Sequence, residues 1–226
     1  MQIMCGRYSI AVEPTEVEER FQASFAEPTE PRFNSAPTQR LPVILNTAPR
    51  TIVLAPWGIK PDWMSTIAKS GGLINVRLET LRDKRTFRSD LAERRCLVPA
   101  DGFYEWKTLP DGKKVPFRIT RTDGKLFAFA GIWQEGLDAG SRMPHFAIIT
   151  TAANDLMQPI HSRMPVILDA GDEAAWLAGA KDVRDLIGML ETPPALAMTA
   201  YEVSRLVNRV AVDTPEIITP VTIYDG

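Results

Sequence analysis

The sequence predicts an α+β fold, in which a single compact domain has a mostly antiparallel, curved or barrel-like β core and short flanking helices. Strand-like apolar runs dominate residues 96–151. Asp-Gly pairs at 111–112 and 123–124 lie between these runs, where hairpin turns are expected. The helical patterns are short and irregularly inserted, whereas a doubly wound parallel sheet would alternate strand and helix regularly.

The helices and strands of the first half follow from local patterns. Residues 14–25 predict a helix, because Pro14 suits a first turn and Val17, Phe21 and Phe25 share one face. Strands are expected at 41–46 and 51–57. A short extended stretch at 74–77 then runs into a helix start, and 87–95 predicts a further helix.

The second half is richer in strands. Apolar, β-branched and aromatic runs predict strands at 96–100, 103–109, 115–121, 126–133 and 145–151, with the Asp-Gly turns joining the middle three. Short helices are expected at 172–179 and 181–190, before a last strand at 196–203.

Composition is typical of a globular protein. The 226 residues are 45% hydrophobic and 24% charged, and neither an internal repeat nor a Gly/Ser linker divides them. We therefore expect one domain over residues 1–226. Since apolar runs fall well short of the roughly 20 residues of a membrane helix, and the N-terminus lacks an apolar signal-peptide region, we expect a cytoplasmic protein without a membrane partner.

The two cysteines, Cys5 and Cys96, have no paired spacing, so neither a disulfide framework nor a CxxC metal motif is indicated. A zinc site would need Cys5, Cys96, His145 and His161 to converge from scattered positions. We expect no metal and no other cofactor. Cys96 begins an apolar strand and suits a buried small hydrophobe, and His145 suits a packed or edge position.

The net charge of −2 argues weakly against a nucleic-acid partner, but one segment is locally basic. Residues 77–95 hold seven basic and four acidic side chains: Arg77, Arg82, Lys84, Arg85, Arg88, Arg94 and Arg95 against Glu79, Asp83, Asp90 and Glu93. This excess could face phosphates, although a solvated helix face gives the same pattern.

The opening MQIMCGRY places Cys5 directly after a second methionine. If translation starts at Met4 and that residue is trimmed, Cys5 carries a free α-amine beside its thiol, and so offers two nucleophiles. If Met1 is retained, Cys5 is an ordinary internal residue whose nitrogen is locked in an amide.

Three further positions are candidates for chemistry. Strand alternation in FYEWK sets Glu105 among aromatic residues, where desolvation would make it a usable acid or base, although a sheet-edge or ion-paired glutamate is an equally simple structural role. Asn75 and Arg77 offer amide and guanidinium groups in a short extended stretch. His161 lies in a polar turn ahead of an apolar strand. Taken alone, Asn75 and Arg77 are more often structural loop residues than ligands.

Together and in order, the motifs carry a resemblance that spans nearly the whole chain. They are MCGRY at 4–8, FNSAPTQRLPV at 33–43, APWGIKPDW at 55–63, INVRLET at 74–80, RRCLVPADGFYEWK at 94–107, AGIW at 130–133, HSRMPVIL at 161–168 and VSRLVNRV at 203–210. This set resembles the SOS-response-associated peptidase (SRAP) family.

The resemblance implies that the chain recognises abasic sites in single-stranded DNA and links to them covalently, as a thiazolidine, through an N-terminal cysteine. Cys5 matches the crosslinking cysteine, and Glu105 matches the glutamate assigned to proton transfer during sugar ring opening. His161 matches the histidine implicated in imine chemistry and crosslink reversal. Asn75 matches the asparagine that contacts the abasic sugar.

The resemblance also implies DNA contacts at Arg77 and, more weakly, at Arg85 and Arg163, with Trp63 and Pro42 in loops that could stack on bases. The partner expected is single-stranded DNA, bound by a monomer at the nucleoid. The sequence departs from the family in carrying three residues before Met4, so we expect residues 1–4 to be absent from the mature protein. A cysteine or N-terminal-nucleophile hydrolase and a DNA-binding module without chemistry remain alternatives.

Overall fold

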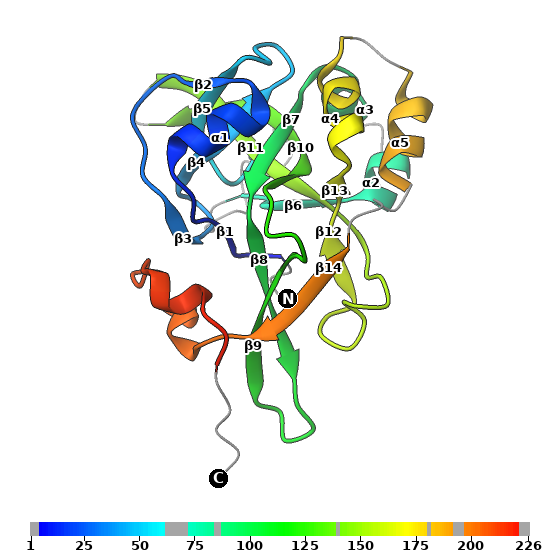
Figure 1. The fold of residues 1–226 in the computed structure, drawn as a ribbon. Coiled ribbons are helices and arrows are strands. Elements are labelled where there is room, and N and C mark those ends of the chain that lie inside the picture. Colours follow the sequence, from blue (N-terminus) through cyan, green and yellow to red (C-terminus); the bar gives the residue numbers. More distant parts are fainter. Residues whose placement is uncertain are drawn as a thin grey trace.

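Two open, curved β-sheets form the centre of the molecule (Figure 1). The computed structural model describes residues 5–61, 72–83, 87–138, 141–179, 182–191 and 197–221. The five-stranded sheet has the order β14-β9-β8-β1-β3. Its strands are β1 (Tyr8–Ile10), β3 (Arg32–Ser35), β8 (Gly102–Thr108), β9 (Lys114–Arg121) and β14 (Met198–Glu202).

The nine-stranded sheet has the order β12-β11-β10-β7-β4-β5-β2, with β13 beside β10 and β6 beside β11. Its strands are β2 (Ser24–Phe25), β4 (Arg40–Leu45), β5 (Thr51–Pro56), β6 (Asn75–Arg77), β7 (Arg95–Ala100), β10 (Phe127–Asp138), β11 (Ser141–Ala152), β12 (Arg163–Pro165) and β13 (Ile167–Leu168). Most pairs are antiparallel, as the sequence predicts; β6 with β11 and β2 with β5 are parallel.

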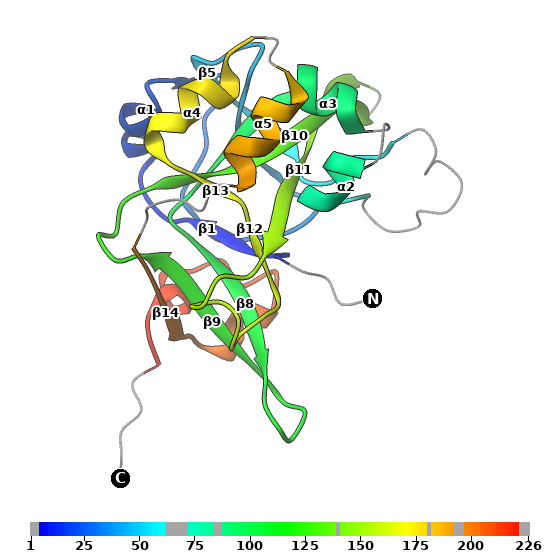
Figure 2. The same cartoon turned by 90° about the vertical axis from the view of Figure 1, so that its right-hand side faces the viewer.

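The α-helices gather at one end of the molecule, and the β8–β9 hairpin projects from the other (Figures 1 and 2). They are α1 (Pro14–Phe21), α2 (Leu78–Asp83), α3 (Arg88–Glu93), α4 (Ala170–Leu177) and α5 (Val183–Glu191). The 3-10 helices at Arg205–Asn208 and Pro215–Ile218 lie apart from this group, against the five-stranded sheet (Figure 1). No helix in the described part of the chain is long and apolar enough to cross a membrane.

Two details of the predicted secondary structure are wrong. Helix α1 ends at Phe21 because Gln22 adopts a left-handed conformation, with φ of 50°, so that Phe25 falls in β2 instead. The Asp-Gly turn at 111–112 does join the paired strands β8 and β9, but the turn at 123–124 leads from one sheet to the other. Residues 127–130 of β10 are buried on both faces, so this strand belongs inside the larger sheet.

Apolar clusters fill three layers. One packs the helices against the nine-stranded sheet, and a second lies between the sheets, where Tyr8, Trp57 and Phe129 make edge-to-face contacts. The third lies on the outer side of the five-stranded sheet, where Tyr104 packs against Val207 and Ile217 of the C-terminal segment. Tyr104 and Phe103 thus bury opposite faces of β8, as strand alternation predicts.

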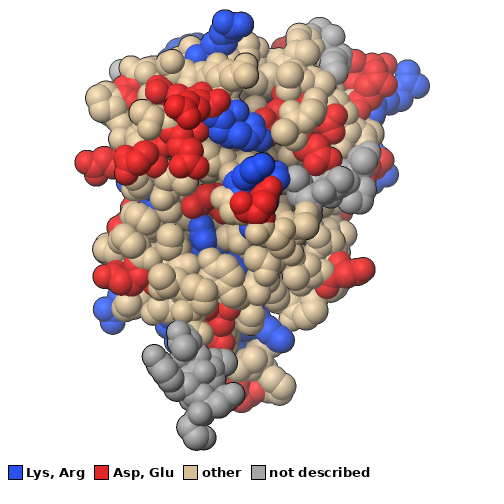
Figure 3. Space-filling model, in the orientation of Figure 1, with Lys and Arg blue, Asp and Glu red and all other residues tan. Residues whose placement is uncertain are grey.

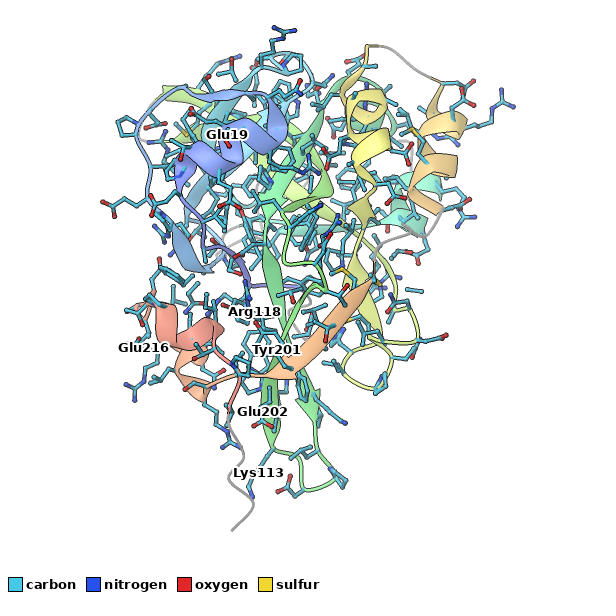
Figure 4. The ribbon with its side chains drawn as sticks, in the orientation of Figure 1. Glu19, Lys113, Arg118, Tyr201, Glu202 and Glu216 are labelled. Carbon is cyan, nitrogen blue, oxygen red and sulfur yellow. The ribbon has the colours of Figure 1, made fainter. Side chains whose placement is uncertain are left out.

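Two buried arginines, Arg118 and Arg95, have polar partners inside the molecule. Arg118 on β9 donates to the Tyr201 hydroxyl of β14 at 2.8 Å, and forms an ion pair with Asp101 at 3.0 Å (Figure 4). Arg95 on β7 is fully buried and donates to main-chain carbonyls at the ends of two helices, those of Leu91 in α3 and Trp176 in α4. Arg95 therefore supplies the hydrogen-bond donors that water would otherwise supply to the last carbonyls of both helices.

Candidate active site around Cys5

Pairing of β1 with β8 brings Cys5 to Glu105. Tyr8 lies opposite Phe103 in the antiparallel register, so the residues before Tyr8 run alongside those after Phe103. The Cys5 backbone N–H donates to Oε1 of Glu105 at 2.7 Å. Both residues are buried, Cys5 with 4% and Glu105 with 2% of its surface exposed. The nitrogen of the predicted nucleophile thus lies against the predicted acid-base residue.

Burial dominates the electrostatics of this pair. Desolvation raises the pKa of the Glu105 carboxyl, and hydrogen bonds from Cys5 together with the charge of His161 oppose that rise. Burial also raises the pKa of the Cys5 thiol, and the Glu105 charge raises it further, against a smaller lowering by Arg163. The thiol is therefore held in its neutral form at physiological pH, while the carboxyl is shifted toward the range in which it exchanges protons.

The backbone of Cys5 is unusual. Its φ of 45° lies in the left-handed region, which costs a residue with a side chain roughly 1–2 kcal/mol. Such strain at a buried residue persists only where neighbouring contacts impose it, here including the hydrogen bond to Glu105.

Asn75 reaches the same place from the other sheet. It lies opposite Ile148 in the parallel pair of β6 and β11, and its Nδ2 donates to the Cys5 carbonyl at 3.4 Å. The preceding carbonyl, of Ile74, accepts from the indole nitrogen of buried Trp57 at 2.8 Å. Trp57 therefore fixes the start of β6, a supporting role that the sequence analysis did not identify, although the motif APWGIKPDW contains it.

His161 ends the turn that precedes β12. Its backbone N–H donates to the Met157 carbonyl at 2.8 Å. Its ring Nδ1 lies 3.1 Å from the Arg163 backbone nitrogen and 3.2 Å from the Arg163 carbonyl oxygen. Hydrogen bonds thus join three of the predicted residues, Cys5, Asn75 and Glu105. His161 lies near enough for its charge to oppose the rise in the pKa of Glu105.

The predicted DNA contacts are more dispersed. Arg77 is exposed on β6, opposite Thr150, and is free to face solvent. Arg163 is only 13% exposed, since it pairs with Glu79 and donates to the Thr150 carbonyl. The expected loop position of Pro42 is wrong, because Pro42 is buried within β4, opposite Leu54. Trp63 and Arg85 lie outside the described residues.

The remaining predicted positions are structural. As the sequence predicts, Cys96 is fully buried in β7 and His145 is a packed residue of β11. The Nδ1 atom of His145 lies 3.2 Å from the Gly58 carbonyl oxygen. Within the described ranges, no group of three or more His, Cys, Asp or Glu side chains is arranged to hold a metal ion. On the face drawn in Figure 3, basic and acidic side chains are interspersed.

A groove of about 530 Å³ lies between α1 and α4, and it is lined in part by Phe21, Ile44 and the Arg20–Glu173 ion pair. None of the four predicted catalytic residues lines it. The predicted site lies around Cys5 instead, where the predicted nucleophile is hydrogen-bonded to the Glu105 carboxyl and to the Asn75 amide.

The sequence comparisons identify the family of the chain. The family model described as "SOS response associated peptidase (SRAP)" matches residues 4–210. The chain belongs to the SRAP family. Its relatives include the abasic site processing protein YoqW of Bacillus subtilis (strain 168), 38% identical over 221 residues, which cover 95% of this chain and 99% of YoqW. The abasic site processing protein YedK of Escherichia coli (strain K12) is 31% identical over 233 residues, covering 96% and 100% of the two chains.

A solved structure supports the SRAP fold of the chain. The crystal structure of a protein from Bacteroides thetaiotaomicron is 25% identical and superposes with a TM-score of 0.83, over 96% of this chain and 100% of that one. The predicted α+β class and its curved, mostly antiparallel sheets are confirmed, and the sheets are open rather than closed into a barrel.

Proposed function

We propose that this protein recognises abasic sites in single-stranded DNA and links to them covalently through Cys5, once residues 1–4 have been removed. The names of relatives that match across nearly their whole length support the substrate. The observation that carries the chemistry is the 2.7 Å contact between the Cys5 nitrogen and Glu105. An N-terminal amine at that position would lie beside a group able to accept and return protons.

The reaction follows from the two nucleophiles of an N-terminal cysteine. An abasic sugar in its open form exposes an aldehyde, which a neutral α-amine attacks, losing water to give an imine. An α-amine has a pKa of about 7.7–8.0 and a lysine amine about 10.4, so far more of the α-amine is neutral in the cell. The Cys5 thiol then adds across the imine C=N bond, its proton passes to nitrogen, and a five-membered thiazolidine closes. Closure is fast because both groups belong to one residue.

The surrounding residues supply proton transfer and orientation. Glu105 moves the protons that open the closed sugar and that remove water from the first adduct. His161 acts on the imine and on reversal of the crosslink. Asn75, whose Nδ2 donates a hydrogen bond to the Cys5 carbonyl, contacts the abasic sugar. The protein acts as a monomer in the cytoplasm, on nucleoid DNA, with Arg77 as a phosphate contact.

A thiol peptidase is less well supported. Such enzymes attack as a thiolate, which needs a lowered thiol pKa, whereas burial and Glu105 raise the pKa of Cys5. A neutral thiol suits the thiazolidine route, in which the amine attacks first and the sulfur follows. The activity we propose on abasic sites therefore does not require proteolysis of other proteins.

Removal of residues 1–4 is the condition for this chemistry, because an amide nitrogen cannot form the imine. The intact mass of the natively expressed protein tests it, and should correspond to residues 5–226. That protein should form a heat-stable adduct with single-stranded DNA carrying an abasic site, and Cys5→Ala should abolish the thiazolidine. Cys96→Ala is the matched control, since Cys96 is the other of the two cysteines and is buried in β7.

An undiminished heat-stable adduct in Cys5→Ala, formed without a reductant, would disprove the proposal. So would a mature protein that retains residues 1–4 and still forms a wild-type yield of adduct.

A further inference from the structure

Glu79 and Arg163 form a two-pronged ion pair at the edge of the site. Nη1 and Nη2 of Arg163 lie 2.6 and 3.0 Å from the two carboxylate oxygens of Glu79. Nη2 also donates to the Thr150 carbonyl at 2.7 Å. The Arg163 side chain is 13% exposed and that of Glu79 is 46% exposed. The guanidinium is therefore held between the Thr150 carbonyl of β11 on its buried side and the Glu79 carboxylate on its solvent side.

This pair connects the two segments that carry Asn75 and His161. Glu79 lies in the first turn of α2, which follows β6 directly, and β6 contains Asn75. Arg163 begins β12, two residues after His161. Both β6 and β12 pair with β11, so the ion pair spans that strand and sets the spacing of its neighbours.

The main chain of Arg163 in turn determines the state of the His161 ring. The Arg163 N–H donates to Nδ1 at 3.1 Å, which requires a lone pair there and places the proton of a neutral imidazole on Nε2. The Arg163 carbonyl, 3.2 Å from the same nitrogen, accepts a hydrogen bond from Nδ1 when the ring is cationic. A fixed Arg163 backbone thus serves both states, with Nε2 left for the reaction.

We propose that Glu79 is a positioning residue for His161 and acts through Arg163, whose backbone it holds against Nδ1 so that Nε2 carries the reactive proton. The inference rests on the proposed function, because it assigns a partner to a residue of that site.

Nitrogen NMR of the imidazole rings tests the proposal directly. The chain has only two histidines, so His145→Gln identifies the His161 signals by subtraction. In the free wild-type protein with a neutral His161 ring, Nδ1 should show the shift of an unprotonated nitrogen and Nε2 that of a protonated one. Glu79→Gln keeps the shape of the side chain but removes its charge, and should give averaged shifts from a mixture of tautomers.

The same variant should separate rate from affinity. We expect Glu79→Gln to slow adduct formation at saturating abasic DNA by roughly 10- to 100-fold, because the His161 ring is no longer held in position. DNA affinity should stay within about twofold of wild type. Glu191→Gln is the matched control, because it removes the charge of an exposed carboxylate on α5 that pairs with Arg82 at 3.3 Å. The rate of adduct formation and the DNA affinity of this control should both remain as in wild type.

Arg163→Lys provides a second variant, which keeps the positive charge and the backbone N–H but cannot form the two-pronged pair. It should reproduce the tautomer mixture, and it decides the matter if Glu79→Gln does not fold. A single wild-type tautomer in the folded variants would overturn the proposal, as would an increased DNA affinity of Glu79→Gln without a loss of rate. If wild-type protein forms no adduct, the proposed function fails, but the NMR result on free protein still decides this inference.

Discussion

The Cys5 nitrogen and the Glu105 carboxylate lie 2.7 Å apart although 100 residues separate them in sequence. The contact joins the backbone nitrogen, rather than the sulfur alone, to the acid-base residue. If residues 1–4 are removed, this nitrogen becomes the α-amine, and the Glu105 carboxyl lies beside it as a group able to take its proton.

Glu105→Gln should slow adduct formation by about 10²- to 10⁴-fold, the usual contribution of positioned acid-base catalysis. An abasic sugar rests mainly in a closed form, so protons must move before the aldehyde is exposed. Single-turnover rates and DNA affinity should be measured together, and the affinity should remain near that of wild type.

A simple aldehyde with no ring to open provides the control for Glu105→Gln. Cys5 is still present in this variant, so its rate with that aldehyde should be close to the wild-type rate. If both substrates slow equally, Glu105 acts on Cys5 itself or on the fold, and the ring-opening role is wrong.

The stability of the protein should also report the buried carboxyl. Burial raises the folded-state pKa of Glu105 above its ordinary value of 4.5. Below that value the carboxyl is protonated in both states and carries no penalty. As pH rises through the raised pKa the folded state must ionise a buried group, so stability is lost, by about 1.4 kcal/mol for each unit of the rise.

Thermal unfolding of wild type and Glu105→Gln across pH 4–8 checks this, using protein that retains residues 1–4 so that no α-ammonium lies beside the carboxylate. The melting temperature of the variant minus that of wild type should increase with pH. Buried Glu173 and Asp90 titrate in both proteins and cancel in the difference. Parallel curves would show that Glu105 titrates at its ordinary pKa.

Arg77→Ala should weaken single-strand binding across sequences and reduce the salt dependence by about one phosphate contact. Arg77 is exposed on the short strand that carries Asn75, so it is placed to follow the backbone next to the abasic sugar. Affinity against salt concentration is the measurement. Arg142→Ala is the control, because Arg142 is 81% exposed on β11 and pairs only with Glu135 among the described side chains. Equal salt slopes for wild type and Arg77→Ala would exclude the phosphate role.

Arg95→Met should lower the free energy of unfolding by about 3 kcal/mol. The substitution leaves the carbonyls of Leu91 and Trp176 without their buried donor at two helix ends. For a chain of this size the loss corresponds to a fall of roughly 6–12 °C in melting temperature. Arg142→Met should change stability by less than about 0.5 kcal/mol. A wild-type melting temperature for Arg95→Met would mean that water replaces the guanidinium at no cost.

The sequence predicts strands where apolar runs are long, as in β7, β8 and β10, because a long apolar run can be recognised from neighbouring residues alone. It also predicts the β6–α2 corner. Strand alternation left the burial of Glu105 as one of two possibilities, beside a sheet-edge or ion-paired position, and the structure shows the buried one. The two-residue strand β2 and the three-residue strand β1 escaped prediction, since strands this short exist only through pairing with β5 and β8. The crossing of the chain from the five-stranded to the nine-stranded sheet after residue 124 was not predicted either, because it depends on the pairing of β10 with the distant strand β7.

The candidate site divides in the same way. Cys5, Asn75, Glu105 and His161 were found through a resemblance, and the structure adds the hydrogen bonds that join Cys5 to Asn75 and Glu105. The Glu79–Arg163 pair was not predicted, because 84 residues separate the partners and local charge patterns do not specify long-range pairing. Arg163 was instead predicted to contact DNA, a role that stays a prediction, as do those of Arg85, Trp63 and Pro42.

The burial of the Cys5 nitrogen has a practical consequence for anyone who expresses this protein. An affinity tag fused ahead of Cys5, and not removed, converts the reacting amine into an amide in a place where less than a twentieth of the residue meets solvent. Such a fusion would fold and purify normally, yet score as inactive in every crosslinking screen. Affinity tags should therefore be placed at the C-terminus. A library of variants displayed as fusions to the N-terminus would block the amine of every variant, so that active variants could not be told from inactive ones.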